Sequence, residues 1–206
     1  MPYLNMQRRL YALLLSLVLV MPVSAAEPEE LAKDLVEKSN AMITQLVTLK
    51  QQNELTSQSA LAVIQKNISP SLDFNRMTQR AMGKHWKKTD EAIRNDIAVA
   101  FQALLENTYA KVLAQYSGQK VKLLKSNTIA GGKKVSVLLQ VYGGSKVAEL
   151  DYIFEQNGNN DHRVTDIKVE GVSLTANYRR QFAAVLRKTG AAGLAAKLQQ
   201  MASKKL

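Results

Sequence analysis

The sequence predicts an α+β fold in which helices wrap a twisted antiparallel sheet of four strands. Two observations support this prediction. Apolar residues recur at helical spacing before Gly118 and after Gly171, whereas between these glycines they alternate with polar residues. The elements also follow the order helices, strands, helices, which is typical of α+β domains.

The first 25 residues are typical of a secretory signal peptide. Arg8 and Arg9 precede a short apolar run, Leu10–Val20, and small residues follow it. The run is about half as long as a membrane-spanning helix requires. We therefore expect residues 1–25 to be removed and residues 26–206 to form one exported domain.

Four helical segments are predicted before the sheet, within residues 29–116. Each starts at a capping or acidic residue and carries apolar side chains at helical spacing. A proline or glycine ends the last three segments. The segments cover residues 29–52, Thr56–Ile68, Asp73–Gly83, and Thr89 to just before Gly118.

Four strands are predicted within residues 119–170, each with its apolar residues on one face. Glycine pairs and an Asn-Gly-Asn-Asn turn separate them, so the connections are short and the sheet is an antiparallel meander. The apolar faces of the last three strands contain Val135, Val137, Leu139 and Val141; Ala148, Leu150, Tyr152 and Phe154; and Thr165, Ile167 and Val169. Helix returns over residues 173–203, with a break at Gly190.

The composition argues against most catalytic chemistry. The chain has no cysteine and two histidines, His85 and His162, far apart in sequence, so thiol catalysis and Cys-ligated metal sites are excluded. No phosphate-binding loop or HExxH motif is present. The strand carboxylates Asp151, Asp166 and Glu170 are expected on a solvent-facing side, paired with lysines such as Lys122 and Lys168. We therefore expect neither an enzyme nor a metal or organic cofactor.

The chain is strongly basic, with a net charge of +11. Removal of Arg8 and Arg9 with the signal peptide would leave +9. An exported basic protein meets anionic membrane surfaces, cell-wall polymers or acidic proteins rather than nucleic acid. An adaptor for acidic partners is therefore one interpretation, and an exported hydrolase is another.

The broad apolar stripes fit two arrangements of the interior. The sheet and helices can enclose a solid core, or they can enclose a hollow lined by residues such as Tyr109, Tyr152, Phe154 and Phe182. Periodicity shows which face is buried and does not distinguish the two.

Three motifs resemble one known family. The segment Asp166–Phe182 resembles the D-x-x-V-E-G-V-S-L-x-x-N-Y-R-x-Q-F signature of the MlaC phospholipid-carrier family, also called the toluene-tolerance family. Upstream, Met82–Lys88 resembles its LGK-aromatic-W turn, and Phe101–Ala110 its F-x-x-L-L-x-x-T-Y-A helix. The chain departs from the family at residues 160–163, where a Trp is common before the last strand.

The resemblance implies a monomeric periplasmic shuttle that carries phospholipid between membranes. Its partners would be an outer-membrane lipoprotein–porin complex and an inner-membrane ABC transporter complex. The family fold buries the acyl chains between sheet and helices and leaves the headgroup at the mouth. The residues expected to line this cavity are Phe101, Leu105, Tyr109, Val137, Leu139, Val141, Tyr152, Phe154, Ile167, Val169, Val172, Tyr178 and Phe182.

Overall fold

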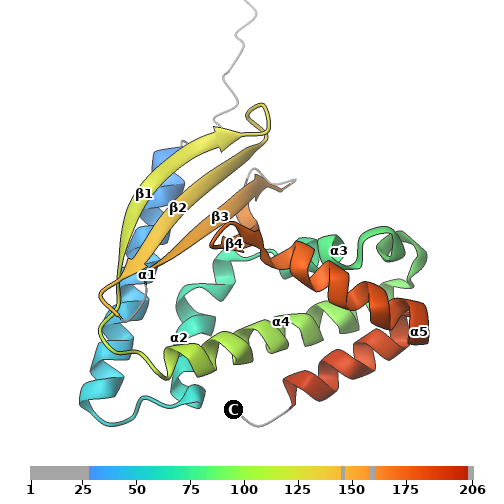
Figure 1. Cartoon of the computed structure of the whole chain (residues 1–206), viewed down its shortest axis with the longest axis horizontal. Helices are drawn as coiled ribbons and strands as arrows, with labels where there is room; N and C mark the ends of the chain where they lie inside the picture. The colour runs from blue at the N-terminus through green and yellow to red at the C-terminus, as the bar shows by residue number, and fades with distance from the viewer. Residues whose placement is uncertain (1–27, 145–146, 158–160, 204–206) are drawn as a thin grey trace, which may run out of the picture.

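The α+β prediction is confirmed by the computed structural model, which describes residues 28–144, 147–157 and 161–203. The expected signal peptide lies outside the described residues. A curved antiparallel sheet lies on one side of the molecule, and most of the helices lie below and beside it (Figure 1). Among the described residues, no helix combines the length and apolar character needed to cross a membrane.

Helices flank the sheet in the sequence, as predicted. Thr56 caps one of them with a complete capping box, in which its side chain accepts from the Ser59 amide and Ser59 bonds back. The Asp73 carboxylate caps another by accepting from the Arg76 amide at 2.8 Å. The helices before the sheet are α1 (Pro28–Gln51), α2 (Ser57–Asn67), η1 (Ser69–Ser71), α3 (Phe74–Met82), η2 (Gly83–Lys88) and α4 (Glu91–Leu113), and α5 (Leu174–Ala202) follows it.

The sheet has five strands rather than the four predicted from the sequence. The additional strand, β5, has only two residues, and it pairs with β4 across a tight turn at Glu170 and Gly171, both of which have positive φ. The strands are β1 (Lys120–Ile129), β2 (Lys134–Tyr142), β3 (Ala148–Gln156), β4 (His162–Val169) and β5 (Val172–Ser173), in the spatial order β1-β2-β3-β4-β5.

The predicted apolar face of the sheet is the face that packs against helices. Val137 and Leu139 of β2 are almost completely buried and pack with Ala32 and Leu35 of α1. On the opposite face, the Lys168 ammonium lies 3.0 Å from the Asp151 carboxylate, as expected for a solvent-facing pair. Period-two alternation therefore assigned the faces of β2 and β3 correctly. In β4 it was wrong at one end, because a register shift between Ile153 and Phe154 brings Val164 onto the apolar face, opposite Phe154, although Thr165 was expected there.

The expectation that Asp166 faces solvent is wrong. Asp166 is buried, and it accepts hydrogen bonds from the Ser173 hydroxyl at 2.6 Å and from the Thr175 amide at 3.0 Å. The tight return of the chain through β5 places the start of α5 beside β4. Asp166 therefore satisfies amide and hydroxyl donors at the beginning of that helix.

The predicted break at Gly190 divides α5 into two arms that fold back on each other (Figure 1). Gly190 has φ 68° and ψ −170°, a conformation open essentially to glycine alone. Both arms pack with α4 in one core cluster, where Phe101 contacts Tyr178 and Phe182 with ring centroids 4.7 and 5.2 Å away. The residues of α4 around Phe101 therefore pack against α5, whereas the cavity described next lies further towards the C-terminal end of α4, from Leu105 onwards.

Candidate functional site

An apolar cavity with a volume of about 160 Å³ lies between the helices and the inner face of the sheet. Apart from Ser69, Glu106 and two tyrosine hydroxyls, its lining side chains are hydrocarbon or thioether. Such a site is suited to an apolar guest, because few polar groups would have to lose water when it enters. The lining residues are Met42, Ile64, Ile68, Ser69, Leu72, Phe74, Met77, Leu105, Glu106, Tyr109, Val112, Leu113, Leu150, Tyr152, Ile167, Val169 and Leu174.

The sheet wall of the cavity follows from strand register. In the antiparallel pair β3–β4, Tyr152 lies opposite Ile167 and Leu150 lies opposite Val169. Residues directly opposite on one face of a sheet form a contiguous patch. These four residues therefore supply one apolar wall.

The facing wall is a stripe on α4. Leu105, Tyr109, Val112 and Leu113 recur at three- and four-residue spacing, so they share one side of the helix. Val112 is 60% exposed and Tyr109 is 37% exposed, whereas Leu105 is buried. The cavity therefore opens towards the C-terminal end of α4 and closes towards Leu105.

One buried carboxylate stands in the wall without a cationic partner among the described residues. The Glu106 carboxylate accepts hydrogen bonds from the Ser69 hydroxyl at 2.7 Å and from the side-chain amide groups of Gln102 and Gln65, each at 2.9 Å. Three neutral donors replace the water that the carboxylate loses on burial. They also tie α2 and η1 to α4, which fixes the spacing of three walls of the cavity.

Two tyrosines bring hydroxyl groups to the cavity. Tyr152 is only 8% exposed, and burial followed by the proximity of Tyr109 raises its pKa to about 12. Burial followed by the proximity of Tyr178 also raises the pKa of Tyr109. Both hydroxyls therefore remain protonated over the physiological pH range.

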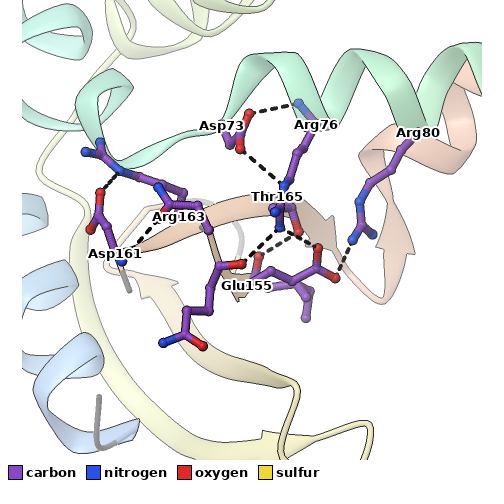
Figure 2. Close-up of polar contacts among 10 residues, drawn as sticks. Asp73, Arg76, Arg80, Glu155, Asp161, Arg163 and Thr165 are labelled. Carbon is purple, nitrogen blue, oxygen red and sulfur yellow. Dashed lines mark hydrogen bonds and ion pairs between the residues drawn. The ribbon is translucent and has the colours of Figure 1, made fainter. Parts of the chain in front are cut away.

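An ion cluster holds α3 against the end of the sheet (Figure 2). The Glu155 carboxylate of β3 lies 2.5 Å from the Arg80 guanidinium, 2.6 Å from the Lys134 ammonium and 3.5 Å from the Arg76 guanidinium. Burial acts to raise the pKa of Glu155, but hydrogen bonds and positive charge from Arg80 and Lys134 outweigh it and leave the pKa below 4.5. Because Phe74 of α3 lines the cavity, this cluster fixes another of its walls.

The structure brings five of the thirteen predicted cavity residues to this cavity. The other eight lie elsewhere. Val172 is 56% exposed on β5, and Val141 lies at the C-terminal end of β2. The remaining six fill solid core beside the cavity instead of lining it. The five cavity residues are Leu105, Tyr109, Tyr152, Ile167 and Val169, and the six core residues are Phe101, Val137, Leu139, Phe154, Tyr178 and Phe182.

Sequence reasoning did not select twelve of the lining residues. Leu150 could have been predicted, since it lies on the same face of its strand as Tyr152. Met42, Ile64 and Met77 belong to helical apolar stripes, which indicate burial without indicating the neighbouring element. Nothing in the sequence marks Glu106 as a buried cavity residue, because a single acidic residue in a helix is normally solvated.

Among the described residues, the lining of the cavity contains no histidine, cysteine, lysine or arginine. No group of three or more His, Cys, Asp or Glu residues suited to a metal ion occurs among residues 28–144, 147–157 and 161–203. The described wall can bury hydrocarbon and donate two hydroxyl hydrogen bonds. These capabilities fit reversible binding.

Comparisons with known proteins agree on one family. A family model described as MlaC protein matches residues 37–200. The intermembrane phospholipid transport system binding protein MlaC of Haemophilus influenzae is 23% identical over 144 residues, which cover 68% of this chain and 67% of that protein. The solved structure of a phospholipid-binding protein from Ralstonia solanacearum, in complex with a phospholipid, is similar with a TM-score of 0.70 and 30% identity. That match covers 83% of this chain and 98% of the other.

Proposed function

The chain belongs to the MlaC family, a family of phospholipid-binding transport proteins, and on that premise we propose that it is a periplasmic carrier of phospholipid between the two membranes. The observation that carries the proposal is the apolar cavity between the sheet and α4. The similar Ralstonia protein, of the same fold, is described in complex with a phospholipid.

The energetics explain why a carrier of this kind is needed. Moving one methylene group out of water gains about 0.8 kcal/mol. Two acyl chains of about fourteen methylenes each therefore lose more than about 20 kcal/mol when a lipid enters water unprotected. An apolar cavity removes most of this barrier, and no covalent step is required.

We also propose the complexes with which the protein exchanges its lipid. Residues 1–25 direct export, and the mature domain then exchanges lipid with an outer-membrane lipoprotein–porin complex and an inner-membrane ABC transporter complex. The name of the Haemophilus relative, a binding protein of an intermembrane phospholipid transport system, supports this arrangement. An adaptor for acidic partners would account for the charge of the chain but would leave the cavity without a role.

Lipid analysis of the purified mature protein tests the cargo. Organic extraction followed by mass spectrometry is expected to find close to one phospholipid per protein. Val112→Trp places a large ring at the exposed end of the cavity and is expected to lower this loading at least about fivefold. Val99→Trp is the matched control, since Val99 lies on the same helix, is 69% exposed and does not line the cavity. Wild-type protein without phospholipid, or equal loading of the two variants, would contradict the proposal.

A further inference from the structure

The cavity contains two hydroxyl donors that the protein does not use. Tyr152 of β3 and Tyr109 of α4 both line it, and they lie near enough for Tyr109 to influence the ionisation of Tyr152. Within the described residues, neither hydroxyl has a hydrogen-bond partner. The polar side chains beside them in the wall, Ser69 and Glu106, are already bonded to each other.

The state of the Tyr152 hydroxyl is unusual for so deeply buried a side chain. Its side chain is more than nine-tenths buried, and buried hydroxyls normally have a partner because losing water without one is costly. Among the described residues, Arg94 Nε is the single fully enclosed side-chain polar atom without a partner. The Tyr152 oxygen therefore borders the free space of the cavity rather than packed protein.

The chemistry of the wall restricts what this hydroxyl can bind. The guest atom must accept a hydrogen bond, and it must be uncharged, since the wall offers an anion no lysine or arginine. In a phospholipid, the ester carbonyls fit this description. They lie between the hydrocarbon chains, which need the closed end of the cavity near Leu105, and the headgroup, which needs the open end near Val112.

We propose that Tyr152 and Tyr109 donate hydrogen bonds to the acyl ester carbonyls of the bound lipid and thereby favour ester-linked over ether-linked phospholipids. This inference rests on the proposed carrier function and adds the linkage chemistry that the cavity recognises. An ether oxygen is a poorer acceptor and lacks the carbonyl that projects from the chain. A site built around a hydrogen bond discriminates against an analogue that cannot form it.

Competitive loading tests the inference directly. The mature protein is equilibrated with vesicles containing equal amounts of a diester and a diether phospholipid with the same headgroup and chain length, and the bound lipids are measured by mass spectrometry. One hydrogen bond is worth about fivefold in binding, so the two together are expected to give the wild-type protein a preference for the ester of about 25-fold. Tyr152→Phe is expected to reduce that preference about fivefold, and Tyr152→Phe combined with Tyr109→Phe to bring the ratio close to one.

Tyr178→Phe provides the matched control. Tyr178 is a neighbouring, partly buried tyrosine with a pKa raised by burial, but it does not line the cavity. Its replacement is expected to leave the ester-to-ether ratio at the wild-type value. All of these variants keep the aromatic ring, and circular dichroism checks that they fold.

The outcomes separate this inference from the proposed function. A wild-type protein that loads both lipids equally overturns the ester preference and leaves the carrier function intact. A Tyr152→Phe variant that keeps the wild-type ratio also overturns the inference. Failure to load either lipid contradicts the carrier function itself.

Discussion

The ion cluster around Glu155 is expected to make the stability of the fold sensitive to acid. Three cations from α3 and β2 surround its carboxylate, whose side chain is 15% exposed. The change that isolates the contribution of this negative charge is Glu155→Gln, which keeps the size and shape of the side chain. In the variant, the three cations repel one another without a neutralising group between them.

The magnitude follows from the contacts. A hydrogen bond to a charged group contributes about 1.5–3 kcal/mol, and the two short contacts from Arg80 and Lys134 are of this type. The cations are about a third exposed, so solvent screening reduces the sum. We expect Glu155→Gln to lower the free energy of unfolding by about 2–3 kcal/mol at pH 7.

The pH dependence gives this prediction its second test. The folded-state pKa of Glu155 is depressed, so its contribution is fully present above the unfolded-state pKa of about 4.5. The contribution is lost as the pH falls through the lower folded-state pKa. The difference between wild type and Glu155→Gln should therefore shrink below pH 4.5 and approach zero once the carboxyl is protonated in both states.

Urea denaturation followed by circular dichroism at several pH values measures both quantities. Asp34→Asn is the control, because Asp34 forms one exposed ion pair with Lys38 and is expected to contribute less than about 0.5 kcal/mol. A Glu155→Gln variant as stable as wild type at pH 7 would refute the assigned magnitude. An equal destabilisation at pH 7 and at pH 3 would refute the electrostatic origin.

Three further predictions concern other parts of the molecule. Glu106→Gln should lower the free energy of unfolding by about 1–3 kcal/mol in urea denaturation. The amide nitrogen of the introduced glutamine must face a side-chain donor of Gln65, Ser69 or Gln102. Unchanged stability would argue against the role of Glu106 as a buried acceptor. Gly190→Ala should cost about 1–3 kcal/mol in the same assay through backbone strain alone, since nothing lies within 4 Å of the added Cβ; a stabilised variant would mean that the arms of α5 straighten. Association of the mature protein with an isolated partner domain should slow between about 50 mM and about 500 mM salt if its charge of +9 steers docking. A constant association rate in a stopped-flow experiment would exclude such steering.

The sheet was largely predictable from sequence because a strand has only two faces. Once Val137 and Leu139 were placed inside, the same parity assigned every other residue of β2, and short turns fixed the antiparallel order. The fifth strand was not predictable in this way. Val172–Ser173 is too short to show alternation, and its pairing depends on a turn through two residues with positive φ.

The division between cavity and core was not predictable, and α4 shows why. Phe101 and Leu105 lie one turn apart on the helix and both are buried, so their sequence signals are the same. Phe101 meets the aromatic rings of α5, whereas Leu105 reaches the cavity. Periodicity reports the direction of a side chain around the helix axis, but the neighbour at each height along the axis depends on tertiary packing.

The size of the cavity places a condition on how the proposed carrier works. A void of about 150 Å³ in a protein core accommodates a molecule the size of benzene, so 160 Å³ is far too little for two acyl chains. A rigid void costs about 24 cal/mol per Å³, which gives about 4 kcal/mol for this cavity and about 19 kcal/mol for one five times larger. The second figure exceeds the typical total stability of a domain, about 5–15 kcal/mol. A rigid empty cavity of lipid size that excluded water would therefore cost more free energy than the fold supplies. We therefore expect the walls to separate as the chains enter, with the burial of those chains supplying the free energy that separates them.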